Sequence, residues 1–214
     1  MINGEVGIVV IGASGHAKVC IELLQAMGHR VAYCVGATDG PATCVGIPVL
    51  KGDTHLAELR KQGYSQVFVA VGANRVRQRL ANKAQSLGYS LVNAVSPLSI
   101  ISPSAKLGKG VAVMAGVIVN AETIIGDLAI INTGACVDHD CHIGKAAHIA
   151  PQCGLAGNVT VGAGSFLGIG CKVIPEVTIG ENVTIGAGGV VVSDIASETL
   201  AVGVPAKPIH IKER

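Results

Sequence analysis

Residues 137–142 read Val-Asp-His-Asp-Cys-His, which places two carboxylates and two imidazoles between apolar neighbours. An imidazole is suited to act as a general base near neutral pH, and an adjacent carboxylate can fix its tautomer and raise its basicity. A solvated polar turn is the structural alternative. The pattern therefore makes His139, with Asp138 and Asp140 beside it, the candidate for proton transfer.

A second polar segment, Gly-Ala-Ser-Gly-His at residues 12–16, follows an apolar run at residues 7–11. A glycine-rich turn at the start of a helix presents free backbone N–H groups that suit phosphate. The dinucleotide fingerprint would need glycine where the chain has Ser14 and Ala17, so NAD is disfavoured and a nucleotide diphosphate remains open. A tight strand-to-helix turn without a ligand is the alternative.

Two other uses of the residues around His139 are open. Zinc would need about three histidines that converge and leave a fourth position free, but His139, His142 and His148 are spaced by three and six residues. Side chains three apart in a strand face opposite ways, which disfavours a metal site. An acyl-enzyme on Cys141, one of seven cysteines, lacks an assigned base.

The elements that position these residues follow from a repeat with a period of six. Such a period is neither helical nor a simple alternation, so it indicates a repeat architecture. The apolar residues of this repeat are Ile101, Leu107, Val113, Val119, Ile125, Ile131, Val137, Ile143, Ile149, Leu155, Val161, Leu167, Val173, Ile179, Ile185 and Val191.

Glycines superimpose a period of 18 on this repeat, at Gly108, Gly126, Gly144, Gly162 and Gly180. Three six-residue units per coil predict a triangular β-helix in which each apolar residue stacks on its counterpart about 4.8 Å away. His139 and His148 are nine residues apart, which is half a coil. One chain therefore cannot bring both to one site, and they can share a site only if a second subunit packs alongside.

The first 95 residues follow another pattern. Apolar runs at 7–11, 31–35 and 67–71 alternate with helical patterns at 17–27, 54–62 and 75–87, which predicts a small parallel α/β sheet. The turn at residues 72–74 would share the carboxyl edge of this sheet with residues 12–16 and form one pocket there. We expect two domains, residues 1–95 and 96–214, with residues 203–214 capping or flanking the solenoid.

Composition limits the remaining function classes. The formal net charge of +2 offers no broad basic surface to nucleic acid, and no apolar run reaches the roughly 18 residues of a membrane span. The beginning of the chain has no basic region typical of a signal peptide. Seven irregularly spaced cysteines indicate reduced thiols, and we expect a cytoplasmic protein.

The chain resembles the sialic-acid O-acetyltransferase type of bacterial sugar acetyltransferases. Within that family it looks most like the nucleotide-4-amino-sugar N-acetyltransferases of the bacillosamine and perosamine pathways. The resemblance covers nearly the whole chain and rests on residues 12–16, 125–144, 155–162, 166–170 and 203–207. It implies a Rossmann-like α/β domain followed by a left-handed parallel β-helix of hexapeptide repeats, assembled as a homotrimer.

The resemblance also assigns roles to residues. His139 matches the general base and Asp140 its acidic partner, with Asn132 and Asp138 as polar neighbours. Acetyl-CoA contacts are implied for His148, Gly157, Ile169 and Ala187, and nucleotide-sugar contacts for Ser14, Gly15, His16, Gly36, Ala37 and Gly72. Gly36 and Ala37 depart from relatives, which commonly have acidic residues there.

The function that we expect is N-acetylation, by acetyl-CoA, of the 4-amino group of a nucleotide-linked dideoxy sugar for bacterial surface glycans. No metal is required, and a UDP-linked sugar is favoured over a GDP-linked one. O-acetylation of a sugar hydroxyl of the sialic-acid type is one alternative. A catalytically silent binding or assembly module is another, against which the Asp-His-Asp cluster argues.

Overall fold

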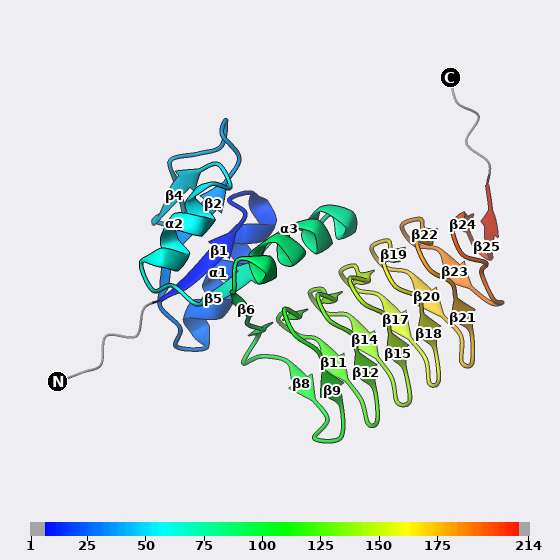
Figure 1. The fold of residues 1–214 in the computed structure, drawn as a ribbon. Coiled ribbons are helices and arrows are strands. Elements are labelled where there is room, and N and C mark those ends of the chain that lie inside the picture. The colour runs from blue at the N-terminus through cyan, green and yellow to red at the C-terminus, as the bar shows by residue number, and fades with distance from the viewer. Residues whose placement is uncertain (1–6, 210–214) are drawn as a thin grey trace. The chain divides into compact units, whose positions relative to one another are not determined.

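The computed structural model describes residues 7–209, which divide into two compact units at Pro97 and Leu98. The first unit is α/β, and the second consists of short parallel strands in stacked coils (Figure 1). The predicted fold class is confirmed. Of the predicted C-terminal tail, residues 210–214 lie outside the described part of the chain.

The sheet of the first unit has the strand order β3-β4-β2-β1-β5-β6. Its strands are β1 (Ile8–Ile11), β2 (Val31–Gly36), β3 (Thr43–Cys44), β4 (Ile47–Lys51), β5 (Gln66–Val69) and β6 (Ser90–Leu91). Its helices are α1 (Gly15–Ala26), α2 (His55–Lys61) and α3 (Asn74–Ser86), and the short strand β7 (Ala94–Val95) contacts α1. All strand pairs are parallel except β3 with β4.

The strand β4 and its hairpin with β3 are additional to the strands predicted from the sequence. Pro48 cannot donate a ladder hydrogen bond and argues against a strand. It lies where β4 pairs with the two-residue strand β3, opposite Thr43. The tight turn is made by Val45 and Gly46, both with positive φ (48° and 75°).

Three parallel sheets form the sides of the solenoid in the second unit. One runs through β10 (Ala112–Val113), β13 (Ile130–Ile131), β16 (His148–Ile149), β19 (Phe166–Leu167), β22 (Thr184–Ile185) and β24 (Leu200–Gly203), and ends in the antiparallel β25 (Ala206–Pro208). The second contains β8 (Ile100–Ile101), β11 (Ile118–Val119), β14 (Cys136–Val137), β17 (Gly154–Leu155), β20 (Lys172–Val173) and β23 (Val190–Val191). The third contains β9 (Lys106–Leu107), β12 (Ile124–Ile125), β15 (His142–Ile143), β18 (Thr160–Val161) and β21 (Thr178–Ile179).

The interior of the solenoid consists of the predicted period-six residues, paired across coils with a register of 18. Ile143, for example, pairs with Ile125 on one side and Val161 on the other. From Val113 onward every one of these side chains is buried, whereas Ile101 and Leu107 at the first coil are only partly covered. Stacked branched aliphatic residues thus supply the core, which explains why so few aromatic residues suffice.

The glycines spaced by 18 allow neighbouring coils to approach closely, and none of them has a positive φ. A Cβ on Gly126 would lie 2.8 Å from the backbone nitrogen of Lys145, which is too close for any residue with a side chain. The positive φ values occur elsewhere in the turns, for example at Glu122, Asp140 and Asn158. Tight stacking of neighbouring coils is therefore the reason for glycine at these positions.

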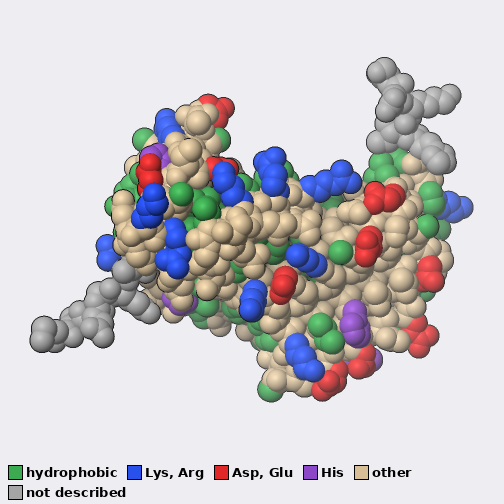
Figure 2. All heavy atoms as spheres, in the orientation of Figure 1, with side chains coloured by type: hydrophobic (Ala, Val, Ile, Leu, Met, Phe, Trp, Pro, Cys, Tyr) green, Lys and Arg blue, Asp and Glu red, His purple; other side chains and the backbone are tan. Residues whose placement is uncertain are grey.

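The surface in Figure 2 carries acidic and basic side chains scattered among uncharged ones over the coils, without a broad region of one sign on that face. None of the helices in residues 7–209 has the length and apolar character that crossing a bilayer requires.

Candidate functional site

The turn that joins β14 to β15 carries the Asp-His-Asp cluster on a corner of the solenoid. His139 Nδ1 lies 2.7 Å from Asp140 Oδ2, and both side chains are 57 % exposed. When the ring is neutral and Nδ1–H donates to this carboxylate, Nε2 presents its lone pair to solvent. That tautomer is the form required of a general base.

The charges around His139 increase its basicity. Its pKa is raised above the ordinary value, chiefly by the hydrogen bond to Asp140 and further by the nearby Asp138 charge. The pKa of Asp138 is lowered, chiefly by the hydrogen bond from Asn120 and then by that from the His139 backbone. Asp138 therefore stays ionised, and its Oδ1 accepts from Asn120 Nδ2 and from His139 N, both at 2.8 Å.

Gly157 lies directly beneath the His139 ring, one coil further along. A Cβ at this position would fall 2.6 Å from Cε1 and 2.7 Å from Nε2 of His139. The imidazole therefore rests on a bare α-carbon. From the sequence we assigned Gly157 to acetyl-CoA, whereas within one chain its nearest functional neighbour is the candidate base.

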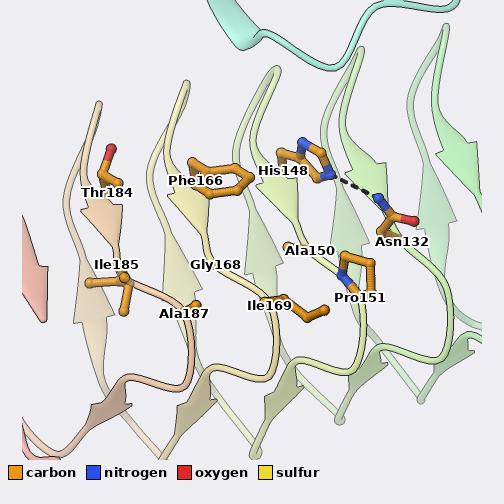
Figure 3. A pocket seen from close by; sticks show the side chains of 11 residues that line it. Asn132, His148, Ala150, Pro151, Phe166, Gly168, Ile169, Thr184, Ile185 and Ala187 are labelled. Atoms are coloured by element: carbon orange, nitrogen blue, oxygen red, sulfur yellow. Dashed lines mark hydrogen bonds between the residues drawn. The ribbon is translucent and has the colours of Figure 1, made fainter. Parts of the chain in front are cut away.

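A mainly apolar groove of about 330 Å³ runs along the outer face of β16, β19 and β22 and their following turns. Figure 3 shows Asn132, His148, Phe166 and Thr184 in a row, with Pro151, Ile169 and Ala187 along the turns. Three predicted acetyl-CoA contacts, His148, Ile169 and Ala187, thus line one groove. An apolar groove with the Asn132 and His148 side chains at one end suits a pantetheine chain that ends in a thioester.

His148 is held at the polar end of this groove by two neighbours. Asn132 Nδ2 lies 3.1 Å from His148 Nε2, while Asn132 Oδ1 accepts from the Thr133 backbone at 2.8 Å. The latter bond orients the amide so that its NH₂ group faces the ring, which makes Nε2 the acceptor and places the proton on Nδ1. Phe166 packs edge-on at 5.2 Å between ring centroids.

The two candidate histidines lie on different sides of the solenoid, as the coil arithmetic requires. His139 is at the corner between the β8–β23 and β9–β21 sheets, and His148 is on the β10–β24 sheet opposite that corner. His142 is the first residue of β15, in the β9–β21 sheet, and its side chain is exposed. Within residues 7–209 no three His, Cys, Asp or Glu side chains converge as a metal would need.

Cys141 is buried and has a structural role. Its thiol donates to the Ala156 carbonyl at 3.2 Å, and burial raises its pKa. A protonated, buried thiol is a poor nucleophile. The geometry therefore argues against an acyl-enzyme on this residue.

In the first unit, the turns after β1 and β5 meet where the strand order changes direction. The chain adds β2 and β4 on one side of β1 and then crosses to place β5 on the other side. Gly12 allows the two turns to touch, because its missing Cβ would lie 2.6 Å from the Ala70 carbonyl oxygen. Open α/β sheets bind ligands at such a switch point, outside the carboxyl ends of the strands.

The predicted nucleotide-sugar contacts are distributed around this edge. Ser14 and Ala37 line a pocket of about 290 Å³ together with Ala13, Gly40 and Pro41. Gly36 is buried, and its missing Cβ would be 3.2 Å from the Cβ of Ala13.

Two further glycines lie in the turns themselves. Gly15 and Gly72 have open space where a Cβ would be, so their backbones are accessible to a ligand. Gly15 opens α1, whose first N–H groups point outward at its N-terminus.

His16 is half-buried against Cys20, 3.5 Å from its Sγ. Burial, followed by the positive charge of Arg77, lowers the pKa of His16 to about 4, so the ring is neutral at physiological pH. Arg77 is fully buried and donates to the Val71 and Gly72 carbonyls at 3.0 and 2.8 Å. It thereby fixes the turn after β5.

Sequence reasoning missed Asn120, Phe166 and Arg77. Asn120 lies 18 residues before Asp138, and Phe166 lies 18 residues after His148. A step of one coil from each of these two residues would therefore have identified both. Arg77 has no comparable signal, because nothing in a helical run of charged residues marks one as buried.

Comparison with known proteins shows similarity over both units. Residues 7–84 match the family described as the PglD N-terminal domain, and residues 158–193 match the bacterial transferase hexapeptide family. The structure is similar to PerB from Caulobacter crescentus in complex with CoA and GDP-perosamine, with a TM-score of 0.93 and 55 % identity over 95 % of this chain and 97 % of that one. A histidine-to-asparagine variant of that perosamine N-acetyltransferase matches equally well, with a TM-score of 0.94.

A more distant relative has the same architecture. The acetyltransferase domain of PglB from Neisseria gonorrhoeae, in complex with acetyl coenzyme A, has a TM-score of 0.88 and 38 % identity over 94 % of this chain and 98 % of that domain. Both relatives are matched over almost their full length, so the similarity includes both units.

Proposed function

We propose a reaction for this chain on one premise: it belongs to the hexapeptide-repeat sugar acetyltransferases that have a PglD-type N-terminal domain. It is accordingly an acyltransferase that takes its acyl group from acetyl-CoA. The reaction that we propose is acetylation of the 4-amino group of a GDP-linked dideoxy amino sugar. The observation that carries it is the hydrogen-bonded His139–Asp140 pair on an accessible corner.

The chemistry of the step follows from the state of this pair. The sugar amine attacks the thioester carbonyl, so a C–N bond forms, the C–S bond breaks, and the amine loses a proton. His139 Nε2 accepts that proton, and it is then returned to the departing thiolate. Asp140 keeps the ring in the required tautomer and stabilises the imidazolium. A general base of this kind contributes about 10²–10⁴ in rate.

The acetyl-CoA site that we propose is the groove lined by His148, Ile169 and Ala187. Its apolar lining would bury the pantetheine chain, and the Asn132–His148 pair would place polar groups at the thioester end. Because His139 lies on the opposite side of the same chain, the base would come from a neighbouring subunit. A homotrimer with three equivalent clefts satisfies this requirement, and cyclic closure is common among homo-oligomers.

The nucleotide sugar would bind at the switch point of the first unit, through Ser14, Gly15, His16, Gly36, Ala37 and Gly72. The first N–H groups of α1 suit a diphosphate. The sequence favoured UDP. We now propose GDP, because PerB, which is 55 % identical, was solved with GDP-perosamine.

An acceptor panel tests the proposal. The protein is incubated with acetyl-CoA and a thiol reagent in the presence of GDP- and UDP-linked 4-amino sugars, a GDP-linked sugar with a 4-hydroxyl, and sialic acid. We expect CoA release with GDP-linked amino sugar and a product heavier by one acetyl group on nitrogen. Turnover confined to hydroxyl acceptors would overturn N-acetylation, and preference for UDP would overturn the nucleotide assignment.

A further inference from the structure

Thr123 lies on the coil before the candidate catalytic turn, in the equivalent turn between β11 and β12. Its side chain is fully buried. The hydroxyl donates to the Asp138 carbonyl oxygen at 2.6 Å and accepts from the Cys141 backbone N–H at 3.3 Å. These two groups flank the segment that carries His139 and Asp140. One hydroxyl therefore ties together both ends of the turn.

The same position on other coils shows that the fold itself does not need this hydroxyl. The residues 36 and 54 positions further along are Val159 and Val177, both buried. The one 18 positions further along is Cys141, whose thiol donates to the Ala156 carbonyl. A hydrocarbon side chain is thus compatible with the corner. Within the row 123, 141, 159, 177 a hydroxyl occurs only at Thr123, in the coil before the turn that carries His139.

A buried hydroxyl at another corner provides a structural counterpart. Ser165 donates to the Gly180 carbonyl at 2.7 Å and accepts from Val183 N at 2.9 Å. It spans the following turn with the same offsets of 15 and 18 residues, and it is equally buried. That turn contains none of the residues proposed for acetyl transfer. Comparing variants at Ser165 and Thr123 therefore separates the effect of a bridging hydroxyl on stability from its effect on the reaction.

We propose that Thr123 is a positioning residue for acetyl transfer: through Asp138 O and Cys141 N it fixes the backbone on which His139 and Asp140 face each other. Without the hydroxyl, the Asp138 carbonyl and the Cys141 N–H would lose a buried partner, and polar groups left in this state drive local rearrangement. A misplacement of about 1 Å in a catalytic group can lower turnover about 10²-fold. This inference rests on the proposed role of His139.

The test compares Thr123→Val, Thr123→Ser and Ser165→Ala in the full chain. Thr123→Val keeps the shape of the side chain and is expected to lower kcat about 10-fold with the KM for acetyl-CoA unchanged. Thr123→Ser restores the hydroxyl and should recover most of kcat. Ser165→Ala should match the loss in Tm of Thr123→Val but retain kcat.

The pH profile supplies a readout that a purely structural role would not move. With the turn relaxed, the Asp140 hydrogen bond that raises the pKa of His139 weakens, so the acid limb of kcat should move to lower pH in Thr123→Val. Thr123→Cys, which copies the residue one coil further along at Cys141, serves if the valine variant does not fold. Its kcat should be lower than that of the wild type, by less than about 10-fold.

Two outcomes would overturn the inference. One is a Thr123→Val enzyme with wild-type kcat and pH profile, and the other is an equal loss of kcat in Ser165→Ala. If His139→Ala itself retained activity, the proposed function would fail. An inactive His139→Ala with an unaffected Thr123→Val would leave that function standing and remove only the role of Thr123.

Discussion

Replacing Gly157 by alanine would act on the candidate base through a single contact. The new methyl group would start 2.6 Å from His139 Cε1, and an ordinary contact begins at 3.4 Å. The ring must therefore retreat by about 0.8 Å. Active-site groups need to be held to within about 0.5 Å, and a misplacement of 1 Å can cost about 10²-fold. We expect kcat to fall by about 10- to 100-fold.

The fold should tolerate this change. Gly157 does not have a positive φ, and the three nearest atoms to its missing Cβ all belong to the His139 side chain, which can move toward solvent. Alanine also restricts the unfolded chain. The expected Tm is within about 4 °C of wild type, equivalent to about 1 kcal/mol for a chain of this size.

The assay is steady-state CoA release with both substrates varied, alongside thermal unfolding. Gly154→Ala is the matched control, because it lies on the same coil and its Cβ would meet only the flexible end of Lys172, at 3.2 Å. That variant should keep its kcat. A Gly157→Ala enzyme with wild-type kcat, or one that loses activity only through unfolding, would refute the reasoning.

The same geometry yields three further predictions. Since the Asp140 hydrogen bond raises the pKa of His139, kcat should fall as pH decreases through that raised pKa. In Asp140→Asn the acid limb of the pH–rate profile should move to lower pH, and kcat should fall less than in His139→Ala. An acid limb at the wild-type pH would count against the His139–Asp140 pair. Ile143→Asp buries a charge among stacked aliphatic residues and should prevent folding, at a cost of several kcal/mol, so soluble active protein by circular dichroism and turnover would contradict the register. Mixed and reassembled His139→Ala and His148→Ala subunits, each first verified inactive, should regain part of the activity, and a fully active monomer by light scattering would exclude a shared cleft.

Much of the solenoid could be predicted because its signal is redundant. The apolar residues from Val113 to Val191 are confirmed as buried, and their period of six, combined with the glycine period of 18, indicated three strands per coil and a register of 18. The same spacing predicts that His139 and His148 lie on different sides of the solenoid, as the structure shows. In a strict repeat, residues that stack on adjacent coils are separated by a constant number of residues, so the sequence spacing shows which residues are neighbours.

The parts that could not be predicted depend on contacts that leave no periodic trace. Pro48 concealed β4, because a proline is rare in strands except at edges and hairpins. The resemblance assigned Gly157 to acetyl-CoA, and only the structure shows that the His139 ring of the neighbouring coil packs against its α-carbon. Thr123 reads as an ordinary polar turn residue, and its role follows only from the two backbone groups that its hydroxyl bridges.

The central claim is that His139 is the base for acetyl transfer to the sugar amine. The most direct test is kcat of His139→Ala with saturating acetyl-CoA and GDP-linked 4-amino sugar, on protein shown by thermal unfolding to be folded. We predict a fall of about 10²–10⁴-fold relative to wild type. A folded His139→Ala enzyme with near-wild-type kcat would contradict this claim.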